Sequence, residues 1–231
     1  MSASRGLYLH AIVGARPREA LGAGLAGGPL RIVRAGGAFV IVERAAAPEP
    51  TAKNLRAHDR IVKRIAAATP AVLPFRFGSV AEGATALRTM LEPVAPAIAK
   101  ALELVSQCVQ YTLRVYRTPA SPTRAAASGR GGGRGRAKQP VGPGTRWLDA
   151  RLRARRVPEI APVTEATAAL VRSSRVERHD RPPLVASVYH LVPRRDVARY
   201  RAALRRAASE LSGVDVRTTG PFPPYAFAEL P

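Results

Sequence analysis

Residues 118–144 restrict the fold of this chain more than any other stretch. Their sequence, TPASPTRAAASGRGGGRGRAKQPVGPG, contains almost no large apolar side chain, so it cannot contribute to a hydrophobic core. We predict a flexible Gly/Arg/Pro-rich linker over residues 118–142. It divides the 231 residues into an N-terminal domain, 1–117, and a C-terminal domain, 143–231, each long enough to form a small core.

The first part of the N-terminal domain is predicted to form strands followed by a helix. Residues 7–13, LYLHAIV, are a β-like run. Residues 30–44 place two apolar runs on either side of Gly36-Gly37, which is typical of a hairpin. From Thr51 the pattern becomes helical, because one face repeats at spacings of three and four. The expected buried stripe consists of Leu55, His58, Val62 and Ile65.

The second part of the N-terminal domain is interrupted by prolines. Residues 71–80 are predicted to form a broken strand and a turn. Residues 82–105 are helical in pattern, but Pro93 and Pro96 should split or kink this helix. Residues 108–116, CVQYTLRVY, alternate and predict a half-buried strand. Its two faces are expected to carry Val109, Tyr111, Leu113 and Val115 on one side, and Cys108, Gln110, Thr112 and Arg114 on the other.

The C-terminal domain is predicted to contain, in order, a helix, a strand, a helix and a strand. Residues 145–157, TRWLDARLRARRV, are helical in pattern, and after two prolines helical character returns in TEATAALV. Residues 183–192, PLVASVYHLV, form a strand. A further helix spans residues 194–211, and Gly213 follows its end. The segment VDVRT, residues 214–218, is the last short strand.

The charge of the chain is strongly positive. It has 37 Lys and Arg against 16 Asp and Glu, a formal net charge of +21, which should attract polyanions or acidic proteins. Residues 129–136, GRGGGRGR, resemble arginine-glycine segments that bind RNA, and this makes a basic nucleic-acid-binding protein the alternative function. The run is short and lacks aromatic residues for stacking. We therefore interpret it as a solvated linker and expect at most weak, non-specific polyanion binding.

No set of residues points to catalysis, a cofactor or a metal. Residues 22–27, GAGLAG, match the G-x-G-x-x-G pattern, but a predicted hairpin follows them where a nucleotide site needs a helix. The four histidines are scattered, and His58 lies on the buried stripe of its helix. Cys108 is the single cysteine, so no intrachain disulfide can form. No apolar run reaches the roughly 18 residues of a membrane span. We expect a cytoplasmic protein that is not an enzyme.

The chain closes with TTGPFPPYAFAEL, residues 218–230. Each proline fixes the backbone and removes an amide donor, so the segment is stiff and loses little entropy when it docks. Phe222 and Tyr225 are three residues apart and share a face in a polyproline II conformation. The tail therefore offers aromatic rings to one surface. Two interpretations remain open: an intramolecular clasp, or an adhesive edge for a partner protein.

This tail resembles the T-G-P-W-P-P-Y-S-F ending of the gas vesicle protein F/L family (GvpL/GvpF). Phe222 replaces the family's tryptophan and loses its indole donor, and Ala226 replaces a serine. The residues that match the family ending are Thr219, Gly220, Pro221, Pro223, Pro224, Tyr225 and Phe227.

Other stretches resemble the same family in the same order along the chain. Residues 58–80 are similar to its His-Glu helix followed by V-L-P-x-R-F-G, with Asp59 in place of the glutamate. The matching positions after the helix are Pro74, Arg76, Phe77 and Gly78. Residues 144–151 and 189–204 are weaker matches. Together with the tail, these stretches extend the resemblance over most of the chain outside the linker.

The resemblance implies an α+β fold of two domains, the C-terminal one ferredoxin-like. It also implies a non-enzymatic protein of the cytoplasm and the gas vesicle, the hollow protein shell that gives cells buoyancy. Such a protein is an assembly accessory or a minor structural component. Its implied partners are the main shell protein, gas vesicle protein A, and other gas vesicle proteins. The matched residues of both motifs are expected to serve as structural or partner contacts.

Overall fold

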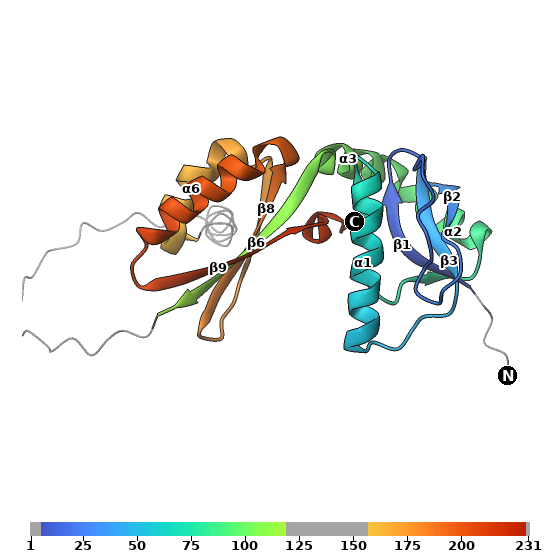
Figure 1. Cartoon of the computed structure of the whole chain (residues 1–231), viewed down its shortest axis with the longest axis horizontal. Coiled ribbons are helices and arrows are strands. Elements are labelled where there is room, and N and C mark those ends of the chain that lie inside the picture. Colours follow the sequence, from blue (N-terminus) through green and yellow to red (C-terminus); the bar gives the residue numbers. More distant parts are fainter. Residues whose placement is uncertain (1–5, 119–156, 230–231) are drawn as a thin grey trace, which may run out of the picture.

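The computed structural model describes residues 6–118 and 157–229, which form a mixed fold of helices and two antiparallel sheets (Figure 1). Residues 119–142 of the predicted linker lie outside the described residues. So do residues 145–156 of the predicted helix, the whole of the GRGGGRGR run, and the last two residues of the chain.

The first sheet is built around the N-terminal strand. Its strand order is β2-β3-β1-β4, and β5 also pairs with β1. The strand predicted at residues 7–13 and the hairpin predicted at 30–44 are confirmed, and Ile32 pairs with Ile41 across that hairpin. The strands are β1 (Leu7–Val13), β2 (Arg31–Ala35), β3 (Ala38–Arg44), β4 (Val72–Pro74) and β5 (Val80–Ala81).

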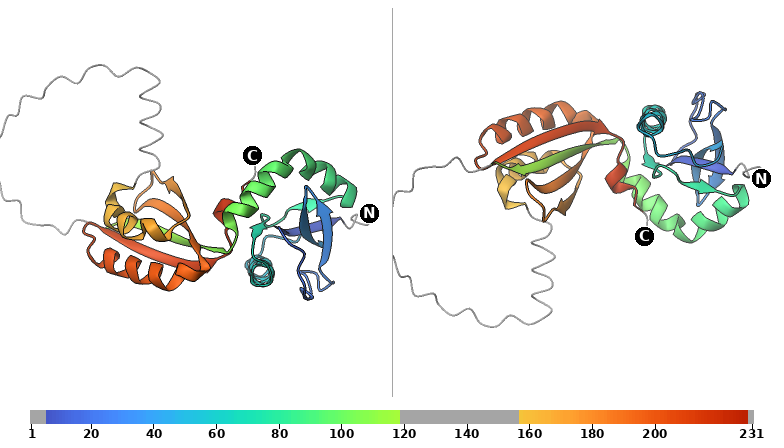
Figure 2. Two further views of the ribbon diagram at one scale, coloured as in Figure 1. Left: turned by 90° about the horizontal axis from the view of Figure 1, so that it is seen from above. Right: turned by 90° about the horizontal axis from the view of Figure 1, so that it is seen from below.

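Helices cover both faces of the first sheet. Helix α1 (Ala52–Ala68) lies on one face, and α2 (Ala84–Leu91) and α3 (Ala95–Val105) pack on the other (Figure 2). The turn η1 (Glu92–Val94) separates α2 from α3, as the prolines predicted. The Thr51 hydroxyl caps α1 by accepting the Asn54 amide hydrogen at 3.2 Å.

One residue of the predicted α1 stripe does not join the core. His58, Val62 and Ile65 are buried, but Leu55 is 45% exposed, so its prediction was wrong. No residue between 52 and 57 is buried, because packing of the helix against the sheet begins only at His58. The apolar stripe of α1 therefore begins in the first turns of the helix, before the part that packs against the sheet.

The second sheet has the strand order β7-β8-β6-β9 and is antiparallel throughout. Its helices α5 (Ala161–Thr167) and α6 (Val197–Ser209) pack against each other and against the sheet. Short turns adjoin them: η2 (Pro158–Ile160), η3 (Ala168–Leu170) and η4 (Arg194–Asp196). The strands are β6 (Cys108–Arg117), β7 (Ser173–Arg178), β8 (Leu184–Pro193) and β9 (Val214–Phe222).

Strand β6 differs from its prediction in two ways. It pairs with both β8 and β9, so the predicted boundary after residue 117 separates it from the rest of its own sheet. The division into two domains itself stays a prediction. Strand β6 is also more than half-buried, since Cys108, Gln110 and Thr112 of the second face are buried along with Tyr111, Leu113 and Val115, whereas Arg114 is exposed. The chain's own tail contacts this second face at Gln110, whose side chain accepts a hydrogen bond from the Ala226 amide.

Strand β9 continues through the first residues of the tail to Phe222 rather than ending at Thr218. The register against β6 shifts between Gln110 and Thr112, opposite Gly220. Gly220 has a φ of 130°, and a Cβ atom there would lie 2.8 Å from the carbonyl oxygen of Gln110. A side chain at this position would therefore collide with the neighbouring strand.

The largest hydrophobic cluster joins the two sheets. It contains Leu73 of β4, Leu191 of β8 and Phe227 of the short turn η5 (Tyr225–Phe227), together with residues of α2 and α3. The side chain of Phe227 is 2% exposed. The end of the chain therefore fills part of a core that both sheets share.

Replacing Phe227 by alanine should lower the free energy of unfolding by about 3–5 kcal/mol, because it removes a buried ring and leaves a cavity. Chemical denaturation followed by circular dichroism measures this change. Met90→Ala is the control, because Met90 is 48% exposed and its truncation should have little effect. Equal stability of Phe227→Ala and the unchanged protein would show that the tail is not part of the core.

Candidate functional site

The two motif segments lie next to each other in space and line one groove. The groove has a volume of about 650 Å³ and opens between the loop after β4, the tail and the second sheet. Residues 74–79 and 225–229 face each other across it, although some 150 residues separate them in the chain. The groove is lined by Pro74, Phe75, Arg76, Ser79, Gln110, Glu177, Tyr189, Tyr225, Ala226, Ala228 and Glu229.

Two hydrogen bonds fix the tail at this groove. The Ala226 amide donates to Gln110 Oε1 at 2.8 Å, and the Tyr225 hydroxyl donates to Asp59 Oδ1 at 3.2 Å. Burial and the neighbouring Asp59 carboxylate raise the pKa of Tyr225 far above its usual range. The tyrosine therefore stays protonated and remains a donor. Asp59 thus links α1 to the tail.

Charged side chains border the groove. Glu229 pairs with Arg76 at 2.6 Å and with Arg175 at 3.4 Å. The Tyr189 hydroxyl donates to Glu177 Oε2 at 2.8 Å. Arg76 and Glu229 are exposed to solvent, so each pair contributes only a few tenths of a kcal/mol to about 1 kcal/mol. Exchanging these ion pairs for ion pairs with charged groups of another molecule would therefore cost little free energy.

The rings of the tail point into the molecule in three different places. Phe222 lies beneath Lys63, whose Nζ is 5.5 Å from the ring centroid. Tyr225 reaches Asp59, and Phe227 enters the shared core. Pro223 and Pro224, between them, are buried. The tail therefore packs against other parts of the same chain, and its rings do not form one exposed row.

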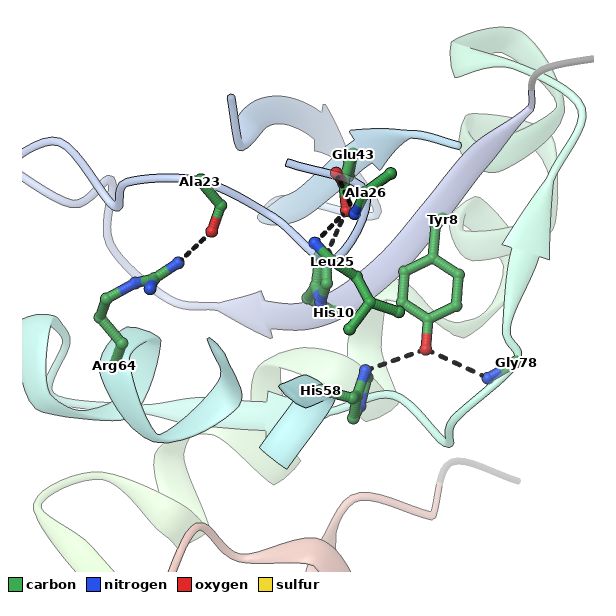
Figure 3. Close-up of polar contacts among 9 residues, drawn as sticks. All are labelled: Tyr8, His10, Ala23, Leu25, Ala26, Glu43, His58, Arg64 and Gly78. Atoms are coloured by element: carbon green, nitrogen blue, oxygen red, sulfur yellow. Dashed lines mark hydrogen bonds and ion pairs between the residues drawn. The ribbon is translucent and has the colours of Figure 1, made fainter. Parts of the chain in front are cut away.

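The other motif residues support a buried aromatic cluster under the first sheet. The ring centroid of Phe77 lies 5.7 Å from that of His58 and 6.3 Å from that of Tyr8. The Gly78 amide donates to the Tyr8 hydroxyl at 3.3 Å, and the same hydroxyl bonds to His58 Nδ1 at 2.9 Å (Figure 3). The L-P-x-R-F-G segment therefore has a structural role on one side, through Phe77 and Gly78, and reaches the groove on the other, through Pro74 and Arg76.

His10 extends this cluster without any hydrogen bond. Its ring stacks on His58 with 5.5 Å between centroids, and neither ring nitrogen has a hydrogen-bond partner. Burial, together with the charges of His58 and Arg64, lowers the pKa of His10 to about 3. His10 is therefore neutral at physiological pH. It has no access to the groove, so acid–base catalysis there is not available to it.

The glycine-rich loop holds a carboxylate of the protein itself. The amides of Leu25 and Ala26 donate to the two oxygens of Glu43 at 2.6 and 2.8 Å, and Glu43 is 1% exposed (Figure 3). Arg64 binds the carbonyl of Ala23 in the same loop. A Cβ atom on Gly24 would lie 2.3 Å from the carboxyl carbon of Glu43. The G-x-G-x-x-G match therefore has a structural cause: it surrounds an internal anion in the way other loops surround a phosphate.

Comparison with known proteins identifies the family. A family model described as "Gas vesicle synthesis protein GvpL/GvpF" matches residues 6–229. The chain belongs to the GvpL/GvpF family. A search of curated proteins found no significant match to the sequence.

Two crystal structures of family members have a similar fold. Gas vesicle protein GvpF from Anabaena sp. PCC7120 has a TM-score of 0.72 and 15% identity, over 98% of this chain and 97% of that one. GvpF from Microcystis aeruginosa has a TM-score of 0.70 and 14% identity, over 98% of this chain and 100% of that one. At this level of identity the likeness establishes the fold that GvpL/GvpF proteins share.

Neither a metal centre nor a membrane span is found in the described parts of this GvpL/GvpF protein. No group of three or more His, Cys, Asp or Glu side chains among residues 6–118 and 157–229 could hold a metal ion. None of the helices described here is both long enough and apolar enough to span a bilayer.

Gly24→Ala should destabilise the protein by about 1–3 kcal/mol, because the new methyl group displaces the Glu43 carboxylate from its two amide donors. Thermal unfolding of the purified variant tests this. Gly14→Ala serves as the matched control, since a Cβ at that position meets nothing closer than 3.9 Å. If both variants unfold at the same temperature, Gly24 is not required by the carboxylate.

Stability should fall as the pH drops from 7 towards 4. The unfolded chain binds a proton at His10 near pH 6.5, whereas the folded chain does so only near pH 3, so the unfolded state holds more protons between these values. One such histidine adds a slope of up to about 1.4 kcal/mol per pH unit. Burial also lowers the pKa of His190, to about 4, so a second group contributes to the same slope.

Replacing His10 by leucine should reduce this slope, which urea denaturation at a series of pH values measures. The slope is the deciding readout, because a change in packing alone shifts the free energy of unfolding equally at every pH. An unchanged slope in His10→Leu would show that His10 does not couple protonation to unfolding.

Proposed function

We propose that this protein is a non-enzymatic assembly accessory or minor structural component of gas vesicles that binds the main shell protein, gas vesicle protein A. Membership of the gas vesicle synthesis family supports a role in vesicle assembly. The observation that carries the proposed binding is the groove at which both family motifs meet. The proposed site of action is the cytoplasm and the gas vesicle.

The groove has the composition of a protein-binding site. Its floor is apolar, through Pro74, Phe75, Ala226 and Ala228, and its border is charged. The family resemblance implies a shell protein that is small, hydrophobic and prone to polymerise. A binder of such a protein has to cover apolar surface until the shell incorporates it. An apolar floor with exchangeable ion pairs at its edges suits that task.

We further propose that residues 108–229 form the predicted ferredoxin-like domain. The described elements follow the order β6, α5, β7, β8, α6, β9, which is the β-α-β-β-α-β pattern. The first strand of this series, β6, lies between the third and the last. The proposed domain therefore begins at β6, and the basic linker is an insertion after its first strand.

A groove-filling substitution tests the proposed binding. Ala228→Leu adds a larger side chain to the groove floor and should reduce the recovery of co-expressed shell protein by about five-fold or more, since the added atoms occupy the partner's place. Recovery is measured by pull-down of the tagged protein in moderate salt with nuclease. Ala99→Leu is the matched control, an equal change at an exposed position of α3.

Equal recovery by Ala228→Leu and the unchanged protein would exclude the groove as the contact. No recovery by the unchanged protein would overturn shell-protein binding itself. Truncation after Thr218 would not be informative. It removes the last four residues of β9 as well as Phe227, so the fold would be disturbed before any contact was tested. The same reasoning applies to replacing Phe222, Tyr225 and Phe227 together.

Nucleic-acid binding is the alternative function. It predicts steep salt dependence of binding to RNA or DNA and loss of function when residues 129–136 are deleted. Those residues lie outside the part of the chain that the structure describes. If the protein instead binds the shell protein through the groove, deleting residues 129–136 should leave the recovery of shell protein unchanged.

A further inference from the structure

Positive charge is concentrated on two helices. Helix α1 carries five Lys or Arg against Asp59 alone, and the segment of η4 and α6 carries six Arg against Asp196 alone. The helical segment from η2 to η3, residues 158–170, has two glutamates and no Lys or Arg. The segment from α2 through η1 to α3 is balanced, with Arg88 and Lys100 against Glu92 and Glu103. The basic surplus is therefore unevenly distributed among the helices.

Both basic helices lie on the same side of the molecule. Helices α1 and α6 are towards the viewer in Figure 1, and both are at the lower edge of the left panel and the upper edge of the right panel of Figure 2. Strand β9 and the beginning of the tail lie between them. Helix α3 is on the opposite side. We name the side formed by α1, β9 and α6 the basic face.

Much of the charge on this face is not neutralised within the protein. Asp196 pairs with Arg195 and Arg199, but Arg201, Arg205 and Arg206 are exposed and have no acidic partner in the described residues. On α1, Lys63 shares the single acidic residue, Asp59, with the tail tyrosine. Unpaired arginines at an exposed helix favour encounter with a negatively charged surface.

A small apolar notch lies between α1, the beginning of the tail and the turn η4 that precedes α6. Its volume is about 160 Å³, enough for one side chain, and the tail segment from Pro221 to Pro224 lines it together with Ala66, Ala67, Val72, Cys108 and Val109. Lys63 of α1 and Arg194 of η4 border it, and Arg194 also donates to the carbonyl oxygen of Ala66 at 2.7 Å. The notch shares no residue with the groove proposed for the shell protein. The basic face thus combines an apolar anchor point with cations on two sides.

We propose that the basic face docks an acidic protein segment that inserts one apolar side chain into this notch. Carboxylates on either side of the anchor would meet Lys63 and Arg194, and others would meet the unpaired arginines of α6. A nucleic acid fits less well. The Lys63 ammonium group already lies 5.5 Å from the centroid of Phe222, the one ring in the notch, so that ring face is not open for a base to stack. The inference does not depend on binding of the shell protein at the groove.

The test uses the full-length protein and two short fluorescent peptides. One peptide is rich in glutamate with a single central leucine, and in the other glycine replaces that leucine. Fluorescence polarisation should show tighter binding of the leucine peptide. Arg205→Glu should weaken it by about five-fold at low salt and by less at high salt, because exposed charge pairs are screened. Lys100→Glu is the control, with the same change of charge on α3.

Ala67→Leu fills the notch without changing the charge. It should weaken binding of the leucine peptide but not of the glycine peptide, and Ala99→Leu should weaken neither. Equal weakening by Arg205→Glu and Lys100→Glu would overturn the proposal, because only net charge would then matter. Tighter binding of an oligothymidine of equal charge, unaffected by Ala67→Leu, would also overturn it and assign the face to nucleic acid.

Discussion

Burial of the Phe227 ring is the contact on which the arrangement of the two sheets depends. The chain leaves the first sheet through α3, builds the second sheet, and returns with its last residues to a cluster that contains Leu73 and Leu191. An aromatic ring contributes more buried apolar area than most side chains, so one residue can join two sheets. The prolines before it have no amide hydrogen, which ends the pairing of β9 at Phe222 and frees the chain to turn inward.

The first sheet depends in a similar way on one buried carboxylate. A glutamate at 1% exposure would be strongly destabilising without donors, and the glycine-rich loop supplies two amides to Glu43. This bond attaches the loop to β3. It also shows how a phosphate-loop pattern can have a structural role: the geometry that suits a phosphate suits a carboxylate as well. His10, whose Nε2 lies 3.6 Å from Glu43 Oε2, stays neutral and makes no hydrogen bond, so part of the acid sensitivity of the fold originates in the same region.

Local patterns in the sequence were sufficient to predict most elements, but not how they assemble. The hairpin around Gly36-Gly37, the start of α1 at Thr51 and the break before α3 are all determined by nearby residues. Strand β7 was missed because an edge strand with the sequence SSRVER has little to bury and shows no alternation. The place of β6 in the second sheet, and the groove between residues 74–79 and the tail, depend on long-range pairing that periodicity does not record.

Because the buried residues of the tail motif hold the fold together, substituting them does not show where a partner binds. The tail's rings are directed at Lys63, Asp59 and the shared core, so any change to them alters folding first. What the folded chain leaves exposed is different: a groove bordered by Arg76 and Glu229, and a basic face with unpaired arginines. A loss of vesicle formation in a tail variant therefore cannot locate the contact. Only substitutions that leave the unfolding temperature unchanged can separate an effect on the fold from an effect on partner binding.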